Sequence, residues 1–208
     1  IVAYLCKEEM YMNLKDARVQ KTRNNIHQVF FKLLKEKPIS RITVSEICQQ
    51  CQINRSTFYR HFEDKYYLRD YVVDNIISYF TTNLDVNFLD IDIYQDFKYT
   101  NILKNSLKKF YTKRRELEIL WAQPLLGRNV FEEMVNAGAE KLEHEILTHK
   151  NISQEKKTFA NWYAKLLINN MLVTIRWWFS HSDLVTADQI TDMMKEHMIA
   201  GTIPTLKK

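Results

Sequence analysis

The chain has 208 residues, of which 46% are hydrophobic, and it contains only three glycines and three prolines. Such a shortage of turn-forming residues leaves little room for β-hairpins and tight loops, so the composition favours an all-α protein of one or two domains with a sizeable core. The net charge of +5 is unevenly placed. Residues 12–69 carry twelve Lys or Arg and five Asp or Glu, a net of +7, whereas residues 76–208 carry seventeen and sixteen, a net of +1. This asymmetry is typical of a DNA-binding module joined to a regulatory body. A merely solvated basic face is the alternative.

The beginning of the chain differs from the rest. We expect residues 1–15 to form an N-terminal extension that is flexible or a remnant of an expression vector, because Met12-Asn-Leu-Lys resembles a natural start. The segment is too short and too charged for a secretory signal. The most apolar run, Phe159 to Phe179, is interrupted by Lys165, Asn169, Asn170 and Arg176, so we expect no membrane span and a cytoplasmic protein.

The basic part of the chain predicts two helices in succession. The first runs from about Arg18 to Lys35, with a buried stripe formed by Ile26, Val29, Phe30, Leu33 and Leu34. Lys37-Pro38-Ile39 connects it to the next helix. Thr43-Val-Ser-Glu46 fits a capping box, in which the Thr43 hydroxyl accepts a backbone N–H and Glu46 reaches back to the cap. A second helix is therefore predicted to start near Val44.

A short polar helix is predicted next, after a break at Gln52-Ile53. Asn54 suits the N-cap of this helix, and Asp64 suits the cap of the helix that follows from Lys65. Phe58 and Phe62 are four residues apart, so they share the buried face. The opposite side presents Arg55, Ser56, Thr57, Tyr59, Arg60 and His61. Two short helices with a tight turn and a polar second helix describe a helix-turn-helix.

The run INRSTFYRHFEDK, residues 53–65, resembles the signature of the TetR family of bacterial transcriptional regulators. The upstream run from Thr22 to Phe30 resembles the first helix of that family, and the resemblance covers roughly residues 18–75. One departure is Gln52, where the family usually has Gly. A left-handed conformation there costs about 1 kcal/mol more for Gln than for Gly, so we expect a strained or slightly altered turn that keeps the motif.

The resemblance implies the organisation of the whole chain. It implies a helix-turn-helix DNA-binding domain over residues 16–75 and a larger helical domain over residues 76–208 for effector binding and dimerisation. The implied function is a sequence-specific transcriptional regulator, a repressor released by an effector. The implied partners are double-stranded DNA with a palindromic operator and a second copy of the chain. An adaptor or co-activator of the same fold, acting through protein contacts, is the alternative.

The expected DNA contacts follow from side-chain chemistry and from the matched positions. Arg55 is the best candidate for reading a base, because its guanidinium matches guanine O6 and N7. Ser56 leaves room for close approach, and Lys65 is expected to hold a phosphate at a helix N-terminus. The remaining candidates, at family positions or beside the DNA backbone, are Thr43, Ser45, Thr57, Tyr59, His61 and, ranked lower, Arg60.

The rest of the chain predicts further helices. The helix from Lys65 ends near Phe80, and residues 83–93 form a weakly patterned linker. Helices then cover residues 94–111, 115–122, 130–149, 154–180 and 187–200, with breaks at Pro124 and Gly127, at residues 151–153 and at residues 182–186. Thr186-Ala-Asp-Gln189 is another capping box.

The helix over residues 154–180 is apolar on two sides and therefore needs two partners. One face holds Phe159, Tyr163, Leu166, Val173 and Trp177. We assign the second face, with the stripe of the final helix, to a two-fold four-helix dimer interface, which the resemblance also implies. The expected interface residues are Trp162, Ile168, Leu172, Ile175, Phe179, Ile190, Met194 and Met198.

The C-terminal part is also rich in aromatic residues, and helical bundles place ligand pockets between their helices. We expect a pocket for a small apolar or aromatic effector, lined by Phe110, Trp121, Phe131, Trp162, Tyr163 and Trp177. Ordinary core and interface packing explains the same residues equally well.

The sequence offers no chemistry for catalysis or metal binding. Cys48-Gln-Gln-Cys51 matches a redox or zinc spacing, but no second ligand pair completes a tetrahedral site, so we interpret both thiols as core residues. No nucleophile elbow, Gly-rich phosphate loop or HExxH motif is present. We therefore expect no enzyme activity, no metal and no cofactor.

Overall fold

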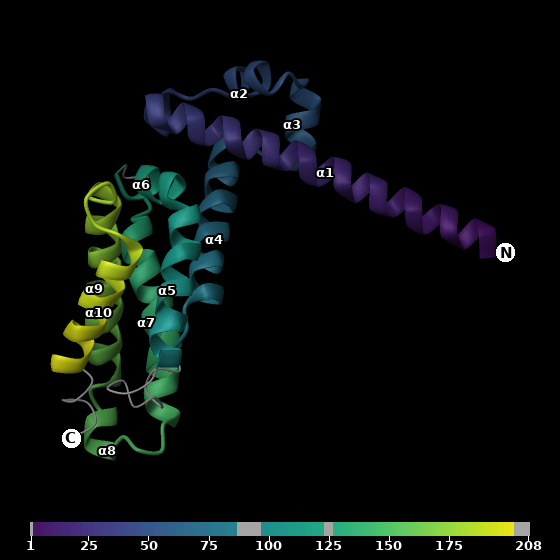
Figure 1. Ribbon diagram of the computed structural model, residues 1–208. Coiled ribbons are helices and arrows are strands. Elements are labelled where there is room, and N and C mark those ends of the chain that lie inside the picture. Colours follow the sequence, from purple (N-terminus) through teal and green to yellow (C-terminus); the bar gives the residue numbers. More distant parts are fainter. Residues whose placement is uncertain (1, 87–96, 123–126, 202–208) are drawn as a thin grey trace. The chain divides into compact units, whose positions relative to one another are not determined.

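The computed structural model describes residues 2–86, 97–122 and 127–201, and the side chains of these residues except 2–16, 97–99 and 198–200. All regular elements in these ranges are helices, so the predicted all-α class is confirmed (Figure 1). The chain forms two compact units, Ile1–Val72 and Val73–Lys208, which are called the N-terminal and C-terminal units below. Across the described ranges, no helix is both long and apolar enough to cross a membrane.

The N-terminal unit begins with α1, Val2–Glu36, followed by the short 3-10 helix η1, Ile39–Arg41. The helix was predicted only from about Arg18, but the residues before it contain no Pro or Gly and many good helix formers, so nothing in them ends a helix. The structure continues α1 through the expected extension, from Val2 onward. Ile26, Phe30, Leu33 and Leu34 of the predicted stripe are fully buried, and Val29 is half-buried.

Helices α2, Val44–Cys51, and α3, Arg55–His61, follow with the predicted starts. The Thr43 hydroxyl accepts the Glu46 backbone N–H at 3.2 Å. The Glu46 carboxylate does not complete the predicted box. It pairs instead with Lys37 Nζ at 2.5 Å, and this hydrogen bond lowers the pKa of Glu46. The cap of α2 is therefore one-sided.

The turn between α2 and α3 has the strained geometry that the sequence predicts. Gln52 has φ 55° and ψ 44°, the left-handed region, and its backbone N–H donates to the carbonyls of Cys48 and Gln49. The N–H of Ile53 also donates to Cys48, at 3.0 Å. These bonds satisfy carbonyls that the end of α2 leaves without helical partners. Asn54 occupies the N-cap of α3, although in the described structure its side chain does not accept an N–H there.

Helix α4 spans Lys65–Asn83, and the division between the two units falls within it, after Val72. Asp64 caps its start as predicted: the carboxylate accepts the backbone N–H groups of Tyr66 at 2.8 Å and Tyr67 at 2.7 Å. Beneath α2 and α3, Ile47, Phe58, Phe62 and Leu68 are at most 1% exposed. The helix-turn-helix is thus held from inside by large apolar side chains, which leaves its polar side outward.

The C-terminal unit is a bundle of helices around its own core. Its further helices are α5, Phe97–Thr112; α6, Arg114–Ala122; α7, Val130–Thr148; α8, Gln154–Lys157; α9, Ala160–Ser180; and α10, Ala187–Ala200. Helix α7 packs along α9, α10 packs along α5 and also contacts α9, and α6 contacts α5, α7 and α9 (Figure 1). The capping box at Thr186 and Gln189 is present in full.

The long helix predicted over residues 154–180 is divided into α8 and α9. The N–H of Thr158 donates to the carbonyls of both Gln154 and Glu155, which tightens the last turn of α8. Phe159, with φ −102° and ψ 13°, then leaves helical geometry and precedes α9. Most of the predicted linker and Pro124 lie outside the described residues.

Candidate DNA-binding surface and ligand cavity

Helix α3 presents most of its predicted contact residues to the outside of the N-terminal unit. Arg55, Ser56, Tyr59 and Arg60 are exposed, Thr57 and His61 are half-buried, and Phe58 between them is fully buried. Because Phe58 and Phe62 fix the rotation of α3, the polar side is rigidly oriented. An exposed helix of this kind can enter the major groove of DNA, which is wide enough for one α-helix.

Arg55 lies at the first position of α3 and contacts α2. Its guanidinium donates a short hydrogen bond to the Ser45 hydroxyl, so two predicted DNA-contact residues are adjacent at the starts of α2 and α3. Thr43, the exposed cap of α2, lies two residues before Ser45. The side chains predicted on both helices therefore belong to one continuous polar surface.

His61 and Arg60 complete the far end of α3. Arg60 donates to the Thr57 hydroxyl at 3.4 Å, a long and weak hydrogen bond. Burial, together with the positive charges of Arg23 and Arg60, lowers the pKa of His61 below its ordinary value. The imidazole is therefore neutral at neutral pH and offers one donor and one acceptor.

Lys65 has a role that the sequence does not reveal. Its ammonium group donates to the carbonyl oxygens of Ile39 at 3.0 Å, Ser40 at 3.2 Å and Ile42 at 2.8 Å. An ammonium group has three protons, so these three carbonyls use all of them. The bonds join the first residue of α4 to η1 and to the residue before the cap of α2. The expected phosphate contact of Lys65 stays a prediction, and it would compete with these bonds.

The Cys48 and Cys51 thiols lie inside the N-terminal unit, 5% and 6% exposed. Burial raises the pKa of the Cys48 thiol, and burial with the neighbouring Cys48 raises the pKa of Cys51 to about 11. Both thiols are protonated near neutral pH and so are poor nucleophiles. Within the described ranges, no three His, Cys, Asp or Glu side chains gather as metal ligands would.

The six residues predicted to line an effector pocket are dispersed over the C-terminal unit. Trp121 stacks on the buried Phe179, with ring centroids 5.9 Å apart, and meets Phe131 edge-on at 5.6 Å, so the half-buried Trp121 and Phe131 pack on other aromatic rings. Tyr163 is buried, whereas Trp162 and Trp177 are 58% and 44% exposed. Only Phe110 of the six lines the cavity described next, so an effector site at the other five residues stays a prediction.

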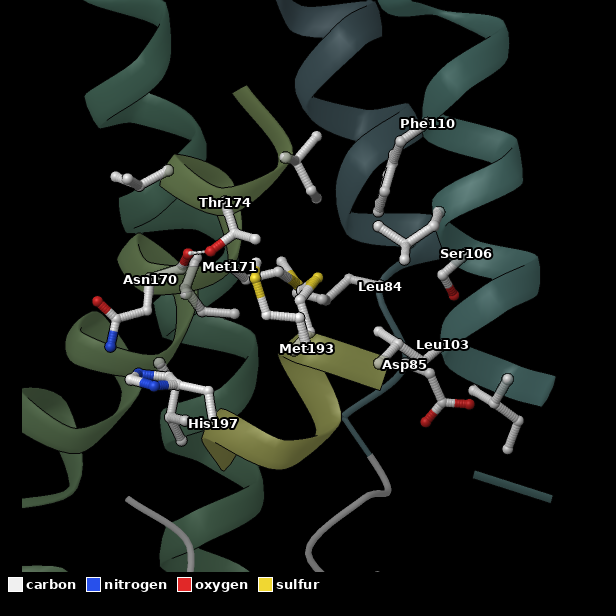
Figure 2. A pocket seen from close by; sticks show the side chains of 17 residues that line it. Leu84, Asp85, Leu103, Ser106, Phe110, Asn170, Met171, Thr174, Met193 and His197 are labelled. Atoms are coloured by element: carbon white, nitrogen blue, oxygen red, sulfur yellow. Dashed lines mark hydrogen bonds between the residues drawn. The ribbon is translucent and has the colours of Figure 1, made fainter. Parts of the chain in front are cut away.

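A cavity of about 260 Å³ lies between α5, α9, α10 and the Leu84–Asp85 segment that follows α4 (Figure 2). Its apolar lining includes Ile102, Leu103, Leu107, Phe110, Met171, Met193 and Met194. The sequence does not predict it, because its lining comes from α5 and from α9 and α10, which lie far from α5 along the chain. The methionines at 171, 193 and 194 are the only local signal, since adaptable thioether side chains are common at ligand surfaces.

The predicted dimer face of α9 and α10 is mostly interior. Six of the eight residues, Ile168, Leu172, Ile175, Phe179, Ile190 and Met194, are at most 5% exposed within a single chain. They form the core of the C-terminal unit and are unavailable to a second copy. Trp162 is exposed, and the Met198 side chain lies outside the described residues.

The opposite face of α9 is apolar and open. Phe159, Trp162, Val173 and Trp177 are 53%, 58%, 41% and 44% exposed, and Leu166 between them is half-buried. The spacings of three, four, seven and four residues place these five side chains on one stripe, called the α9 stripe below. Four of these five residues belong to the first of the two apolar faces that the sequence predicts for this helix, and Trp162 belongs to the second.

Comparisons with known proteins agree with this architecture. The sequence model of the bacterial regulatory proteins of the tetR family matches residues 31–72, the segment from the end of α1 to the first part of α4. No curated protein matches the chain.

Solved structures share the fold over nearly the whole chain. A TetR transcriptional regulator from Streptococcus agalactiae 2603V is 20% identical, with a TM-score of 0.54, and covers 95% of this chain and 99% of its own. NalD, the secondary repressor of the MexAB-OprM multidrug efflux pump in Pseudomonas aeruginosa, is 18% identical, with a TM-score of 0.63 and coverages of 88% and 97%. The dihydroxyacetone kinase operon activator DhaS is 15% identical, with a TM-score of 0.58 and coverages of 90% and 98%.

The comparisons therefore show two things: the chain has the fold of these solved regulators, and residues 31–72 match the sequence model of the tetR family of bacterial regulatory proteins.

Proposed function

We propose that this protein is a sequence-specific DNA-binding transcriptional regulator that works as a homodimer, represses its target and releases DNA when a small molecule occupies its C-terminal unit. The observation that carries the proposal is the polar side of α3, held outward by the fully buried Phe58 and Phe62. The net charge of +7 over residues 12–69 supports attraction to the phosphate backbone. A protein of this kind acts where the chromosome lies, which places it in the cytoplasm.

The roles on DNA divide between base reading and positioning. Arg55 and Ser56, at the start of α3, are assigned to base edges, because the N-terminal residues of a recognition helix reach deepest into the groove. The other candidates are assigned to contacts with the DNA backbone or with neighbouring bases: Thr43, Ser45, Thr57, Tyr59, Arg60 and His61. Lys65 is assigned to positioning through its three carbonyl contacts, with a phosphate contact as the competing role.

A second copy is needed because one short helix reads few bases. Two recognition helices about 34 Å apart read a palindrome, and a two-fold axis supplies that arrangement. The α9 stripe is the surface assigned to the partner copy, since large exposed apolar side chains such as Trp162 and Trp177 are typical interface anchors.

A dimer bound across a promoter blocks transcription without any further contact, so repression is the simpler outcome, although the fold occurs in both an activator and a repressor. The cavity lies beside Leu84, directly after the end of α4, and its wall residue Ser106 donates to the carbonyl of Asn83, the last residue of α4, at 3.2 Å. A ligand there would act on the end of the helix that begins at Lys65, shifting a pre-existing equilibrium.

Selection from a pool of randomised duplexes, followed by affinity measurements on the enriched sequence, tests this function. We expect the wild-type protein to enrich a palindrome. Arg55→Ala should lose about 1–3 kcal/mol of discrimination at one symmetric pair of positions, because the bidentate contact to guanine is removed. Arg115→Ala, at an exposed arginine of α6, is the control with equal loss of charge and should bind as the wild type does. If no sequence is enriched and the protein binds no duplex at low salt, the adaptor function replaces this one.

A further inference from the structure

The cavity of the C-terminal unit has chemical features that restrict what it can hold. Its volume of about 260 Å³ is below the range of roughly 300–1,000 Å³ that suits drug-sized ligands. Met171 comes from α9 and Met193 and Met194 from α10, and Figure 2 shows Met171 and Met193 together in the middle of the lining. The thioether side chains are flexible and polarisable, so they adapt to apolar shapes and make favourable contacts with aromatic rings.

Two hydroxyl groups of the lining offer only lone pairs to a ligand, whereas the Asn170 amide can both donate and accept hydrogen bonds. The Ser106 hydroxyl donates to the Asn83 carbonyl at 3.2 Å, and the Thr174 hydroxyl donates to the Asn170 carbonyl at 2.8 Å. Each hydroxyl has spent its single proton, so toward a ligand it offers lone pairs. Such a wall suits a ligand with one O–H or N–H group.

The charges around the cavity disfavour an anion. Among the described side chains that line it, the titratable ones are Asp85 and His197, and no Lys or Arg contributes. The two lie toward the lower part of the view in Figure 2, away from Phe110, and His197 is exposed to solvent. A carboxylate or phosphate placed among the apolar side chains would lose its hydration without gaining a cationic partner, which is costly.

We propose that the cavity between α5, α9 and α10 binds a compact, uncharged, mostly apolar molecule carrying a single hydrogen-bond donor, and that it discriminates against anions of the same size. The inference rests on the proposed effector control, and it specifies the chemistry of the effector: a molecule about as large as a substituted benzene ring, without a carboxylate or phosphate.

Isothermal titration of the full-length protein with two probes of similar size tests the inference. The uncharged probe is para-ethylphenol, and the anionic probe is para-toluate. We expect para-ethylphenol to bind one molecule per chain and to raise the melting temperature, because binding only to the folded state stabilises it. We expect para-toluate to bind at least about tenfold more weakly, since an unpaired charge is disfavoured in an apolar site.

Two variants locate the binding site. Ile102→Trp enlarges a half-buried side chain of the lining and should weaken para-ethylphenol at least about tenfold by filling the space. Asn101→Trp, at the preceding exposed position of α5, is the matched control and should leave the affinity unchanged. Met171→Lys places an ammonium group in the lining and should reverse the preference between the two probes. Circular dichroism melts report whether each variant folds.

The inference is overturned if para-ethylphenol shows no saturable binding, if para-toluate binds as tightly, or if Ile102→Trp binds as the wild type does while folded. Failure of the proposed function is recognised separately. A protein that binds para-ethylphenol in this cavity but enriches no duplex would keep the ligand site and lose the regulatory role. A protein that enriches a palindrome but binds neither probe would do the reverse.

Discussion

At the scale of single residues, the geometry of the helix-turn-helix depends on two side chains, Gln52 in the turn and Lys65 at the start of α4. Gln52 has a positive φ of 55°, which costs an L-residue with a side chain more than it costs glycine. Lys65 donates to three carbonyls of the segment before α2. Gln52 therefore destabilises the helix-turn-helix, whereas Lys65 stabilises it. Substitutions at the two positions should have opposite effects on the free energy of unfolding.

Gln52→Gly should raise the free energy of unfolding of the N-terminal unit by about 0.5–1 kcal/mol, because glycine adopts the left-handed region without a Cβ penalty. Gln50→Gly, inside α2 and exposed, is the matched control and should lower it by about 0.5–1 kcal/mol, since glycine is a poor helix residue. Urea unfolding followed by circular dichroism measures both. A Gln52→Gly protein that is less stable than the wild type would show that the turn is not strained.

Lys65→Met should lower the free energy of unfolding by about 1–3 kcal/mol, because a charged donor to three carbonyls is removed. Its affinity for DNA should fall while the slope of log affinity against log salt stays that of the wild type. A direct phosphate contact predicts instead that the slope becomes shallower by about 0.9 for each phosphate that Lys65 no longer neutralises. Lys35→Met, at an exposed lysine near the end of α1, controls for the removal of one charge. A shallower slope with unchanged stability would restore the phosphate role.

At the scale of elements, the packing of the C-terminal unit is organised around α9, which contacts α6, α7 and α10. Its buried side packs along α7, where Gly138 permits a close approach: a Cβ at this position would lie 2.9 Å from a ring carbon of Phe80 and 3.0 Å from a side-chain carbon of Ile168. The sequence correctly predicts where most helices start and that α9 is apolar on two sides. Both features depend on residues close together in sequence, since caps and hydrophobic periodicity are local. Which side of α9 is buried depends on α7 and on Gly138, and the local pattern does not contain that information.

Gly138→Ala should destabilise the C-terminal unit by about 1–3 kcal/mol, because the added methyl group overpacks the contact with Phe80 and Ile168. The sign is informative, since the same change at an exposed helical position stabilises by up to about 1 kcal/mol. Asn136→Ala, exposed in the same helix, is the control and should be neutral or slightly stabilising. Thermal unfolding compares the two, and an equal or higher melting temperature for Gly138→Ala would mean that α7 has room to move.

At the scale of the whole molecule, recognition of a palindrome needs two copies of a chain with a basic N-terminal unit. The charge asymmetry and the helix-turn-helix are readable from residues 12–69, because both depend on residues close together in sequence. The cavity is not readable, because Leu84, Phe110, Met171 and Met193 meet only in the folded bundle. For the same reason the sequence does not show that Trp121 and Phe131 are half-buried and pack edge-on against each other outside the cavity.

Trp162→Glu should convert the proposed dimer into a monomer, because a carboxylate on the α9 stripe would be buried without a partner at the proposed interface. The fold of each chain should survive, since Trp162 is 58% exposed within it. Tyr67→Glu, at a 54% exposed tyrosine of the N-terminal unit, should remain dimeric. Sedimentation velocity measures the mass of all three proteins. A Trp162→Glu protein that sediments like the wild-type dimer would place the interface elsewhere.

The salt dependence of affinity for the selected duplex is the sharpest test of whether the outward side of α2 and α3 binds duplex DNA. We expect tight binding at low salt and a steep linear fall of log affinity with log salt, with about 0.9 in slope for each phosphate contact. Combining Ser45→Ala, Arg55→Ala and Tyr59→Ala should abolish preference for the selected duplex without unfolding the protein, because all three positions are exposed. Two results would contradict DNA binding by this surface. One is an affinity that does not change with salt concentration, and the other is a triple variant that binds the selected duplex as tightly as the wild type does.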